Sequence, residues 1–472
     1  MRMLPKITVK QYLGTSSVLL LICAGPALSE TVFTETVTKF PGWAWVQAAE
    51  GNQAIYPGQN AVINGGGLVP GQTVTLMRGQ TVLNAEGPLT VDAEGKFSFE
   101  ITVDDEAVPG IQPIVLLTEN PAAAEIVDLK ISSELPVSGA DLFDIEYRKV
   151  DGGQYLYQVA FSEAQNALFV TSSVGRPPIK ESALLKIDPE TLETITSVTP
   201  DGPAPVGEDG YETGLFAVYG VAVDDAHNHV WVSNTRQDAA AVYSTEDLSL
   251  VKQFEPGVVS HPRDVAVDPG RNRVYISASG ADEIAVFDSE TLEQLDPIEI
   301  QSKQWEGKFA PMALDIDPES GTLVTVSLET PEAAIIDLNS REVNVVELKG
   351  MKGAWGVAYD PQEKLLFAVS MSSDNLLIVN ADSGEVLHDV RLDAGPLNVT
   401  FDPVSRLAFI ASRSPGRITA VDTAGKIVAN LEAGPLTNKL RADGKGNIYA
   451  VNQSLEKDDP QGDRVWRLRA KQ

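Results

Sequence analysis

Cysteine is almost absent from this sequence. Its 472 residues contain one, Cys23, which falls within the first 30 residues. If that leader is removed, the remaining chain has no thiol, so disulfides and thiolate-bound metal sites are excluded. Such a chain suits an oxidising compartment, and its fold must be held together by the burial of apolar side chains.

Long apolar runs are also lacking, apart from one short stretch near the N-terminus. Three basic residues precede an apolar segment at 18–24, and a small-residue cleavage pattern follows at 27–29. The segment is shorter than the roughly 20 residues that a membrane-spanning helix needs. We predict that residues 1–29 are a secretory signal peptide cleaved near Ser29, and that the protein is periplasmic without a transmembrane anchor.

Positive charge is in short supply. The chain has 36 Lys and Arg residues against 66 Asp and Glu residues, and its formal net charge is −30. Cleavage after Ser29 removes three basic residues and no acidic one, which gives −33. This charge repels nucleic-acid phosphates and anionic lipids unless basic residues are locally concentrated. Nucleic acid is therefore a disfavoured partner, although it is not excluded.

Motifs for catalysis and metal binding are missing as well. The sequence has no G-x-S-x-G nucleophile elbow, no phosphate-binding P-loop and no H-E-x-x-H zinc motif. His227 and His229 form the one pair with metal-like spacing, and two histidines alone leave a zinc site short of ligands. We therefore expect no metal and no cofactor, name no catalytic residue, and favour a non-catalytic protein.

The sequence does contain a repeat. A hydrophobic residue, an Asp and a turn recur, with the Asp at positions 224, 268, 317, 360, 402 and 443. The successive spacings are 44, 49, 43, 42 and 41 residues, and Phe161-Ser162 is a degenerate earlier copy. Short strands repeated with such a period are the signature of a β-propeller. Seven copies predict an all-β fold with a seven-bladed propeller.

Residues 31–135 lack this repeat. They show short alternating strands separated by Gly and Pro turns, which predicts a small β-sandwich. Two segments of this region, GGGLVPGQTVTL and DAEGKFSFEITV, resemble bacterial immunoglobulin-like domains. Residues 136–141 are the expected linker, and residues 142–472 the propeller. The last repeat ends before a fourth strand, so we predict that residues 142–149 supply that strand and close the ring.

The longest predicted connections lie on one rim of the propeller. They span residues 172–182, 199–219, 301–311 and 453–463, and each leads into the first strand of a blade or joins its second and third strands. Loops gathered on one face of a rigid scaffold indicate a binding face. The same rim collects the candidate ligand-binding residues, which are Tyr155, Tyr157, Tyr219, Asn234, Arg236, His261, Arg263, Trp355, Arg413 and Lys439.

Two interpretations of these rim residues stay open. Guanidinium groups and aromatic rings can hold an anionic ligand through paired hydrogen bonds and stacking. Arg236, Arg263 and Arg413 lie at equivalent edges of three predicted blades, so their side chains could converge on the channel mouth. Alternatively, these cations pair with carboxylates of neighbouring blades and have a structural role.

Three segments resemble a known family. HPRDVAVD…NRVYIS at 261–277, KIDPETLE at 186–193 and the ending NIYAVNQSLEKDDPQGDRVWRL at 447–468 resemble YncE-like periplasmic propellers and the wider YVTN repeat family. The resemblance covers about residues 145–470. It implies a periplasmic seven-bladed propeller without established enzymatic activity, and an association with single-stranded DNA.

These observations favour one function over two alternatives. We expect a non-catalytic periplasmic binding or scaffold propeller, monomeric, that binds an anionic small molecule or an envelope protein on the long-loop rim. The first alternative is a divalent-metal lactone hydrolase of the propeller type, which needs a Glu, an Asn and an Asp in the channel; Asn234, Asn398 and Asn452 could face it, and Glu329 is the nearest Glu. The second alternative is single-stranded DNA binding.

Overall fold

The computed structural model describes residues 39–51, 54–200, 202 and 213–471. Within these ranges the regular structure is almost wholly β, and the only helices are two 3₁₀ turns, η1 (Ala140–Leu142) and η2 (Thr235–Gln237). None of the described helices has the length and apolar character that crossing a membrane requires. The predicted signal peptide lies outside the described residues.

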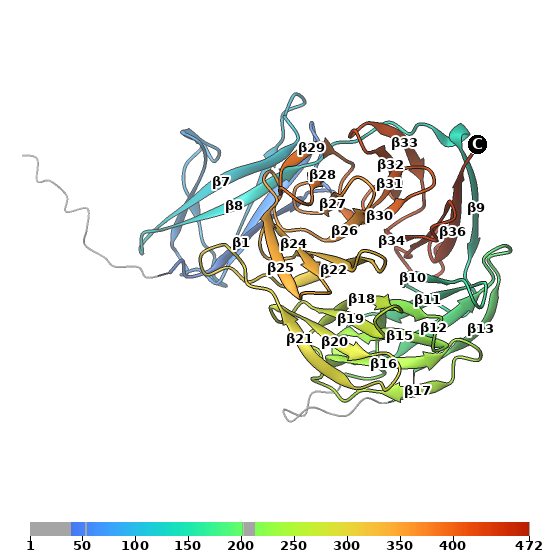
Figure 1. The fold of residues 1–472 in the computed structure, drawn as a ribbon. Helices are drawn as coiled ribbons and strands as arrows, with labels where there is room; N and C mark the ends of the chain where they lie inside the picture. The colour runs from blue at the N-terminus through green and yellow to red at the C-terminus, as the bar shows by residue number, and fades with distance from the viewer. Residues whose placement is uncertain (1–38, 52–53, 201, 203–212, 472) are drawn as a thin grey trace, which may run out of the picture.

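Seven four-stranded antiparallel sheets form a ring of blades (Figure 1). The all-β propeller predicted from the repeat is therefore confirmed. The strands of blades 1 to 3 are β10 (Leu156–Ser162), β11 (Ala167–Val174), β12 (Glu181–Ile187), β13 (Thr194–Val198), β14 (Val218–Asp224), β15 (His229–Asn234), β16 (Ala239–Ser244), β17 (Leu250–Gln253), β18 (Pro262–Asp268), β19 (Arg273–Ala278), β20 (Glu283–Asp288) and β21 (Gln294–Glu299). Those of blades 4 to 6 are β22 (Pro311–Asp317), β23 (Thr322–Ser327), β24 (Glu332–Asp337), β25 (Glu342–Glu347), β26 (Gly356–Asp360), β27 (Leu365–Ser370), β28 (Asn375–Asn380), β29 (Val386–Arg391), β30 (Pro396–Asp402), β31 (Leu407–Ser412), β32 (Arg417–Asp422) and β33 (Ile427–Glu432).

The position of a strand within its blade follows from its sequence pattern. The second strand of blade 5, β27, is LLFAVS and is buried along its whole length, because both of its faces pack against neighbouring blades. The fourth strand, β29, is VLHDVR and alternates between partly buried and exposed residues. Continuous apolar strands therefore lie inside the ring, and strands with period-2 alternation form its outer surface.

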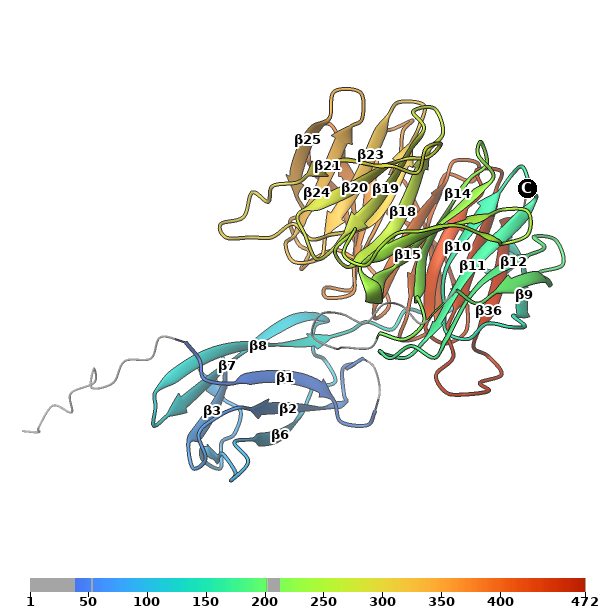
Figure 2. The ribbon, with the colours of Figure 1, turned by 90° about the horizontal axis from the view of Figure 1, so that it is seen from below.

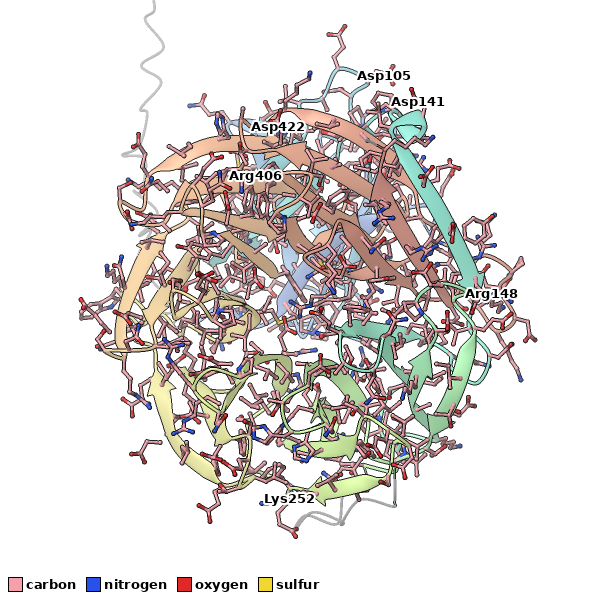
Figure 3. The ribbon with its side chains drawn as sticks, turned by 45° about the vertical axis from the view of Figure 1, so that its right-hand side comes forward. Asp105, Asp141, Arg148, Lys252, Arg406 and Asp422 are labelled. Atoms are coloured by element: carbon pink, nitrogen blue, oxygen red, sulfur yellow. The ribbon has the colours of Figure 1, made fainter. Side chains whose placement is uncertain are left out.

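Blade 7 is completed by a strand from before the first repeat. It contains β34 (Thr437–Ala442), β35 (Asn447–Asn452) and β36 (Arg464–Ala470), and β9 (Phe143–Lys149) pairs antiparallel with β36 as the fourth strand. The ring of Phe143 packs edge-on against that of Phe409 in blade 6, with 5.8 Å between centroids. In Figure 3, Arg148 on β9 lies at the periphery of the ring, as Lys252 does on β17, the outer strand of blade 2. The segment at 142–149 thus occupies the place that the incomplete last repeat predicts.

The N-terminal domain contains two sheets around one core. The three-stranded sheet has β1 (Trp43–Ala48), β2 (Asn60–Gly66) and β6 (Phe97–Thr102), and the other sheet has β3 (Thr73–Arg78), β4 (Thr81–Val82), β5 (Leu89–Thr90), β7 (Gly110–Glu119) and β8 (Ala123–Ile131). Their inner faces share apolar residues such as Ile63, Leu76 and Leu116. The strand β1 was not among the predicted ones, and the likeness of this domain to immunoglobulin-like domains stays a prediction.

The N-terminal domain lies against the long-loop rim of the propeller, as Figure 2 shows from below. The ammonium group of Lys130 forms a 2.8 Å ion pair with Asp374, and the hydroxyl of Ser132 donates to the same carboxylate at 2.7 Å. The amide of Leu135 donates to Asp393 at 2.6 Å, and Ser138 exchanges backbone hydrogen bonds with Asn430. The predicted linker is therefore fixed to blade 6 through Ser138, and the residues just before it contact the loops that follow β27 and β29 in blade 5.

Candidate functional site

The first strand of most blades carries a β-bulge where it begins at the long-loop rim. In blade 1, Leu156 pairs with Ser172 and Val159 with Val170, so one extra residue of β10 lies between the two pairs. Strands β14, β18 and β22 share this shift, and β30 and β34 have a related one. A bulge re-aims the side chains next to it. Here these side chains surround a cavity at the centre of the ring.

This rim cavity has a volume of about 290 Å³. Two successive residues near the start of the first strands provide most of its lining, and the ends of two second strands provide the rest. The lining residues are Tyr157, Gln158, Tyr219, Arg263, Asp264, Met312, Ala313, Trp355, Met371, Leu397, Asn398, Arg413, Asn438 and Lys439. Six of the ten predicted site residues are among them.

Two tyrosines and an arginine form one wall. The rings of Tyr157 and Tyr219 lie 4.1 Å apart between centroids. Arg236 Nε donates to the hydroxyl of Tyr219 at 3.1 Å, and its guanidinium lies 5.7 Å from the centre of that ring. Burial raises the pKa of Tyr157, and the neighbouring Tyr219 raises it further. The phenol of Tyr157 is therefore a neutral hydrogen-bonding group at physiological pH.

Arg263 enters the cavity without an acidic partner. Its Nη2 lies 2.9 Å from His261 Nε2, which must be the acceptor because a guanidinium can only donate, and its Nε donates to Ser279 Oγ at 3.4 Å. No described carboxylate lies within 4.0 Å of it. Burial lowers the pKa of Arg263, and Arg236 adds to this effect. Burial and then Arg263 lower the pKa of His261, which keeps this imidazole neutral.

Arg413, on the other side of the tyrosine pair, also has only neutral hydrogen-bond partners among the described residues. It donates to Asn438 Oδ1, and its Nη2 donates to Gln453 Oε1 at 3.0 Å. Both acceptors are neutral, and the described part of the chain places no carboxylate at ion-pair distance. Burial lowers the pKa of Arg413. Two partly buried guanidinium groups in a strongly acidic protein therefore keep their positive charge unbalanced.

The floor of the cavity is different, because its charges are paired. Lys439 Nζ lies 2.8 Å from Asp264 Oδ2, and both side chains are almost fully buried. Arg441 lies 4.0 Å from Asp264 and 3.9 Å from Asp315. Burial acts to raise the pKa of Asp264, but Lys439 and Arg441 together hold it below its usual value. Lys439, which was predicted as a ligand-binding cation, lines the cavity, but its charge is paired with Asp264 across the ring.

The four remaining predicted residues lie outside the cavity lining. Tyr155 and His261 occupy a turn with positive φ, 54° and 47°, immediately before a first strand. Their backbone amides donate at 2.7 Å to Asp463 and Asp238 respectively, so this position caps a turn rather than contacting a ligand. His261 still supports Arg263. Asn234 is buried and accepts from Gln253 at 3.0 Å, so it does not face the axis.

The three arginines do not occupy equivalent positions. Arg263 follows Pro262 at the start of a first strand, whereas Arg236 and Arg413 follow the second strands β15 and β31. Arg236 reaches the cavity only through Tyr219. The prediction that all three converge on the channel mouth therefore applies in the structure to Arg263 and Arg413, which both line the cavity.

Sequence reasoning missed the apolar and acidic part of the lining. Met312 and Leu397 line the cavity and directly follow Pro311 and Pro396, as Arg263 follows Pro262. This repeated proline, which begins three of the first strands, is the signal that could have found them. Asp264 follows Arg263 and has the corresponding position one residue further along the strand.

The two histidines with metal-like spacing lie at the opposite rim, His227 between β14 and β15 and His229 at the start of β15. His227 Nδ1 lies 2.7 Å from Asp224 Oδ2, and the rings of His227 and His229 are 6.2 Å apart. Across the described ranges, no three His, Cys, Asp or Glu side chains are grouped closely enough to hold a metal ion. His227 is therefore held in its turn by Asp224, and His229 is the partly buried first residue of β15.

The N-terminal domain borders the cavity through blade 5. Lys130 Nζ donates at 2.7 Å to the carbonyl of Met371, whose side chain lines the cavity. Asp374, three residues further on, also accepts from Gly395 at 2.9 Å in the loop that leads to Leu397. The loops of blades 5 and 6 that carry two lining residues are thus held by contacts with the N-terminal domain.

Comparison with known proteins identifies relatives of the propeller. No model of a known protein family matches the chain. The uncharacterized proteins YncE of Salmonella typhimurium and Salmonella typhi are each 23% identical over 333 residues, which cover 67% of this chain and 88% of theirs. The homology to YncE, together with the fold, supports a β-propeller of YncE-like sequence.

Solved structures share the propeller architecture at low identity. They include virginiamycin B lyase from Staphylococcus aureus (12% identity, TM-score 0.53, 70% of this chain and 100% of that one) and a streptogramin B lyase (11%, 0.54, 70% and 98%). Hydrazine synthase of Kuenenia stuttgartiensis is 17% identical with a TM-score of 0.51, over 64% of this chain and 94% of that one. At these identities the likeness concerns the fold alone.

Proposed function

We propose that this protein is a non-catalytic binding propeller of the periplasm that holds an anionic small molecule in the rim cavity. The observation that carries the proposal is the pair of arginines, Arg263 and Arg413, that line the cavity without acidic partners. Burying an uncompensated charge is unfavourable, so such groups are usually neutralised or used. A bound anion supplies counter-charge to these groups and accepts several charge-assisted hydrogen bonds.

The test compares arginine variants inside the cavity with one outside it. Arg263→Gln removes charge from the cavity, whereas Arg273→Gln removes a similar charge that is paired with Asp288 at 2.8 Å near the opposite rim. Native mass spectrometry of the gently purified protein should detect a co-purifying small anion. We expect Arg263→Gln and Arg413→Gln to lose it and Arg273→Gln to keep it. An anion retained by all three variants would place binding elsewhere and contradict the proposal.

The metal-dependent lactone hydrolase finds less support. Asn398 and Asp264 line the cavity, but both oxygens of Asp264 already accept hydrogen bonds: Oδ2 accepts from Lys439 Nζ and the amide of Leu314, and Oδ1 accepts from the amide of Val265. Glu329, the nearest predicted glutamate, is exposed and does not line the cavity. The described residues therefore do not assemble the donor set that this chemistry needs.

A protein partner on the same rim is the second candidate. Trp305 lies in the connection from blade 3 to blade 4, and 91% of its surface is exposed. Glu332 fixes the base of this loop by accepting from Ser302 Oγ at 2.6 Å and from the amide of Lys303 at 2.8 Å. Exposed tryptophans on anchored loops are typical of protein-binding hot spots. Trp305→Ala should leave the melting temperature unchanged and abolish capture of an envelope partner in cross-linking; retained capture would remove this candidate.

Single-stranded DNA binding stays the third possibility from the sequence resemblance. The protein has a net charge of −30, which disfavours binding of a phosphate backbone. If DNA binds, its affinity should fall steeply with salt. No binding of an oligothymidine at low salt would eliminate this partner.

A further inference from the structure

The rim cavity has two chemically different halves. Going round the ring, Arg413 and Asn438 of blades 6 and 7 are followed by Tyr157, Tyr219 and Arg263 of blades 1 to 3. We call this half the polar arc. Because consecutive blades are neighbours, its five side chains are contiguous, with one unpaired guanidinium at each end.

The other half is apolar. Met312 of blade 4, Trp355 and Met371 of blade 5, and Leu397 of blade 6 line the cavity in sequence, and we call them the apolar arc. All four are partly exposed, so they present free apolar surface and are not closed core positions. Methionine side chains adapt their shape and pack well against aromatic rings.

The floor adds no net charge to either half. Asp264 and Lys439 neutralise each other at 2.8 Å, so the uncompensated charge of the cavity lies in the polar arc alone. A ligand that contacts both arcs must be amphipathic, with its anionic group toward the arginines and its apolar body toward Leu397 and Trp355. A cavity of about 290 Å³ has room for a body of one or two rings.

We infer that the ligand of the rim cavity is a small aromatic carboxylate; this inference rests on the proposed function and names its substrate class. A carboxylate is planar and matches the two parallel donors of a guanidinium. A flat aromatic body fills the slot between the tyrosine pair and the apolar arc. A compact oxyanion such as sulfate leaves the apolar arc uncovered, and a neutral aromatic leaves two buried guanidinium groups without a counter-charge.

Calorimetric titration of the full chain with three probes tests this inference. The probes are 2-naphthoate, the neutral analogue 2-naphthalenemethanol, and sulfate. We expect 2-naphthoate to bind at least tenfold more tightly than either of the others. Arg263→Gln and Leu397→Asn remove one feature from each arc, and each should weaken 2-naphthoate binding at least fivefold. The matched control Arg273→Gln should bind it as the unaltered protein does.

The outcomes separate this inference from the proposed function. If sulfate binds as tightly as 2-naphthoate and depends on Arg263, the ligand class is wrong and the anion site stands. If 2-naphthalenemethanol binds as tightly as 2-naphthoate, or neither anion binds, both fail. Should Arg263→Gln not fold, as judged by its melting curve, Arg413→Gln tests the other end of the polar arc. Binding of 2-naphthoate that no cavity variant changes also overturns the inference.

Discussion

The two layers of charge at the centre of this propeller differ in one respect. In the lower layer, Lys439 and Arg441 lie among the acids Asp264 and Asp315, which come from blades on the other side of the ring. In the upper layer, Arg263 and Arg413 have only neutral hydrogen-bond partners in the described structure. Paired charges contribute to the stability of the folded state, whereas unpaired charges can bind a ligand of opposite charge. On the proposed function, this difference distinguishes the structural cations Lys439 and Arg441 from the ligand-binding cations Arg263 and Arg413.

The largest expected effect comes from breaking the lower layer. Lys439→Met leaves the buried carboxylate of Asp264 without its closest counter-charge, which we expect to reduce the free energy of unfolding by about 3–5 kcal/mol. Urea denaturation measures this loss. The double variant Asp264→Leu/Lys439→Met removes both charges and should recover most of it. A single variant as stable as the unaltered protein would mean that the two layers do not differ.

Lys130, between the two domains, is a second paired cation, and its loss should reduce the free energy of unfolding by less than the loss of Lys439 does. Lys130→Met leaves Asp374 with two hydrogen-bond donors, Ser132 and the amide of Gly395, so the loss should be about 1–3 kcal/mol. The melting temperature of the full chain and protease cleavage between residues 133 and 139 both report it. Lys96→Met, at an exposed lysine of the same domain, should change neither. Equal behaviour of the two variants would show that the joint carries no charge clamp.

The pH dependence of stability sharpens the picture of the lower layer. Burial raises the pKa of Asp315 in the folded state, although Arg441 opposes this. The stability that protonated Asp315 contributes is therefore fully present below the pKa of this residue in the unfolded chain. It is lost as the pH rises through the pKa of Asp315 in the folded protein. Asp315→Asn cannot ionise, so this variant should gain stability relative to the unaltered protein between pH 4 and pH 7. Because 27% of the Asp315 side chain is accessible, solvent keeps the effect modest. A stability difference that is the same at both pH values would contradict this.

The smallest effect belongs to the upper layer. Arg263→Gln loses hydrogen bonds to His261 and Ser279 but also removes a desolvated charge beside Arg236. We expect the free energy of unfolding to change by no more than about 1 kcal/mol in either direction. A loss similar to that of Lys439→Met would show that Arg263 is a structural cation after all.

The sequence contains enough local information to predict the blades. The hydrophobic-Asp repeat and its period-2 strands predict seven sheets, and the incomplete last repeat predicts the pairing of residues 142–149 with the end of the chain. The cationic half of the cavity also follows, because Arg263, Tyr157 and Tyr219 flank the starts of predicted first strands. These features depend on neighbours within one repeat.

The charge pairs of the cavity floor and of the domain contact could not be predicted, because they join residues far apart in the sequence. Asp264 and Lys439 are 175 residues apart, and no local pattern indicates which residues meet across the axis. The same holds for Lys130 and Asp374, which are 244 residues apart and fix the N-terminal domain to the rim. Met312 and Leu397 were missed for another reason, since an apolar residue at a strand start resembles a core position unless the preceding proline is used to mark that start.

The closing strand β9 also determines when the ring can form. Its partner β36 follows every other described blade strand in the chain, and the ion pair between Glu146 and Arg467 joins residues 321 positions apart. β9 can therefore pair only after β36 has been synthesised, whereas each of the six blades between β9 and β34 consists of strands that are consecutive in the sequence. Long-range pairing of this kind slows folding. Closure of the ring, and with it the assembly of a cavity built from both ends of the propeller, therefore depends on the pairing of β9 with β36.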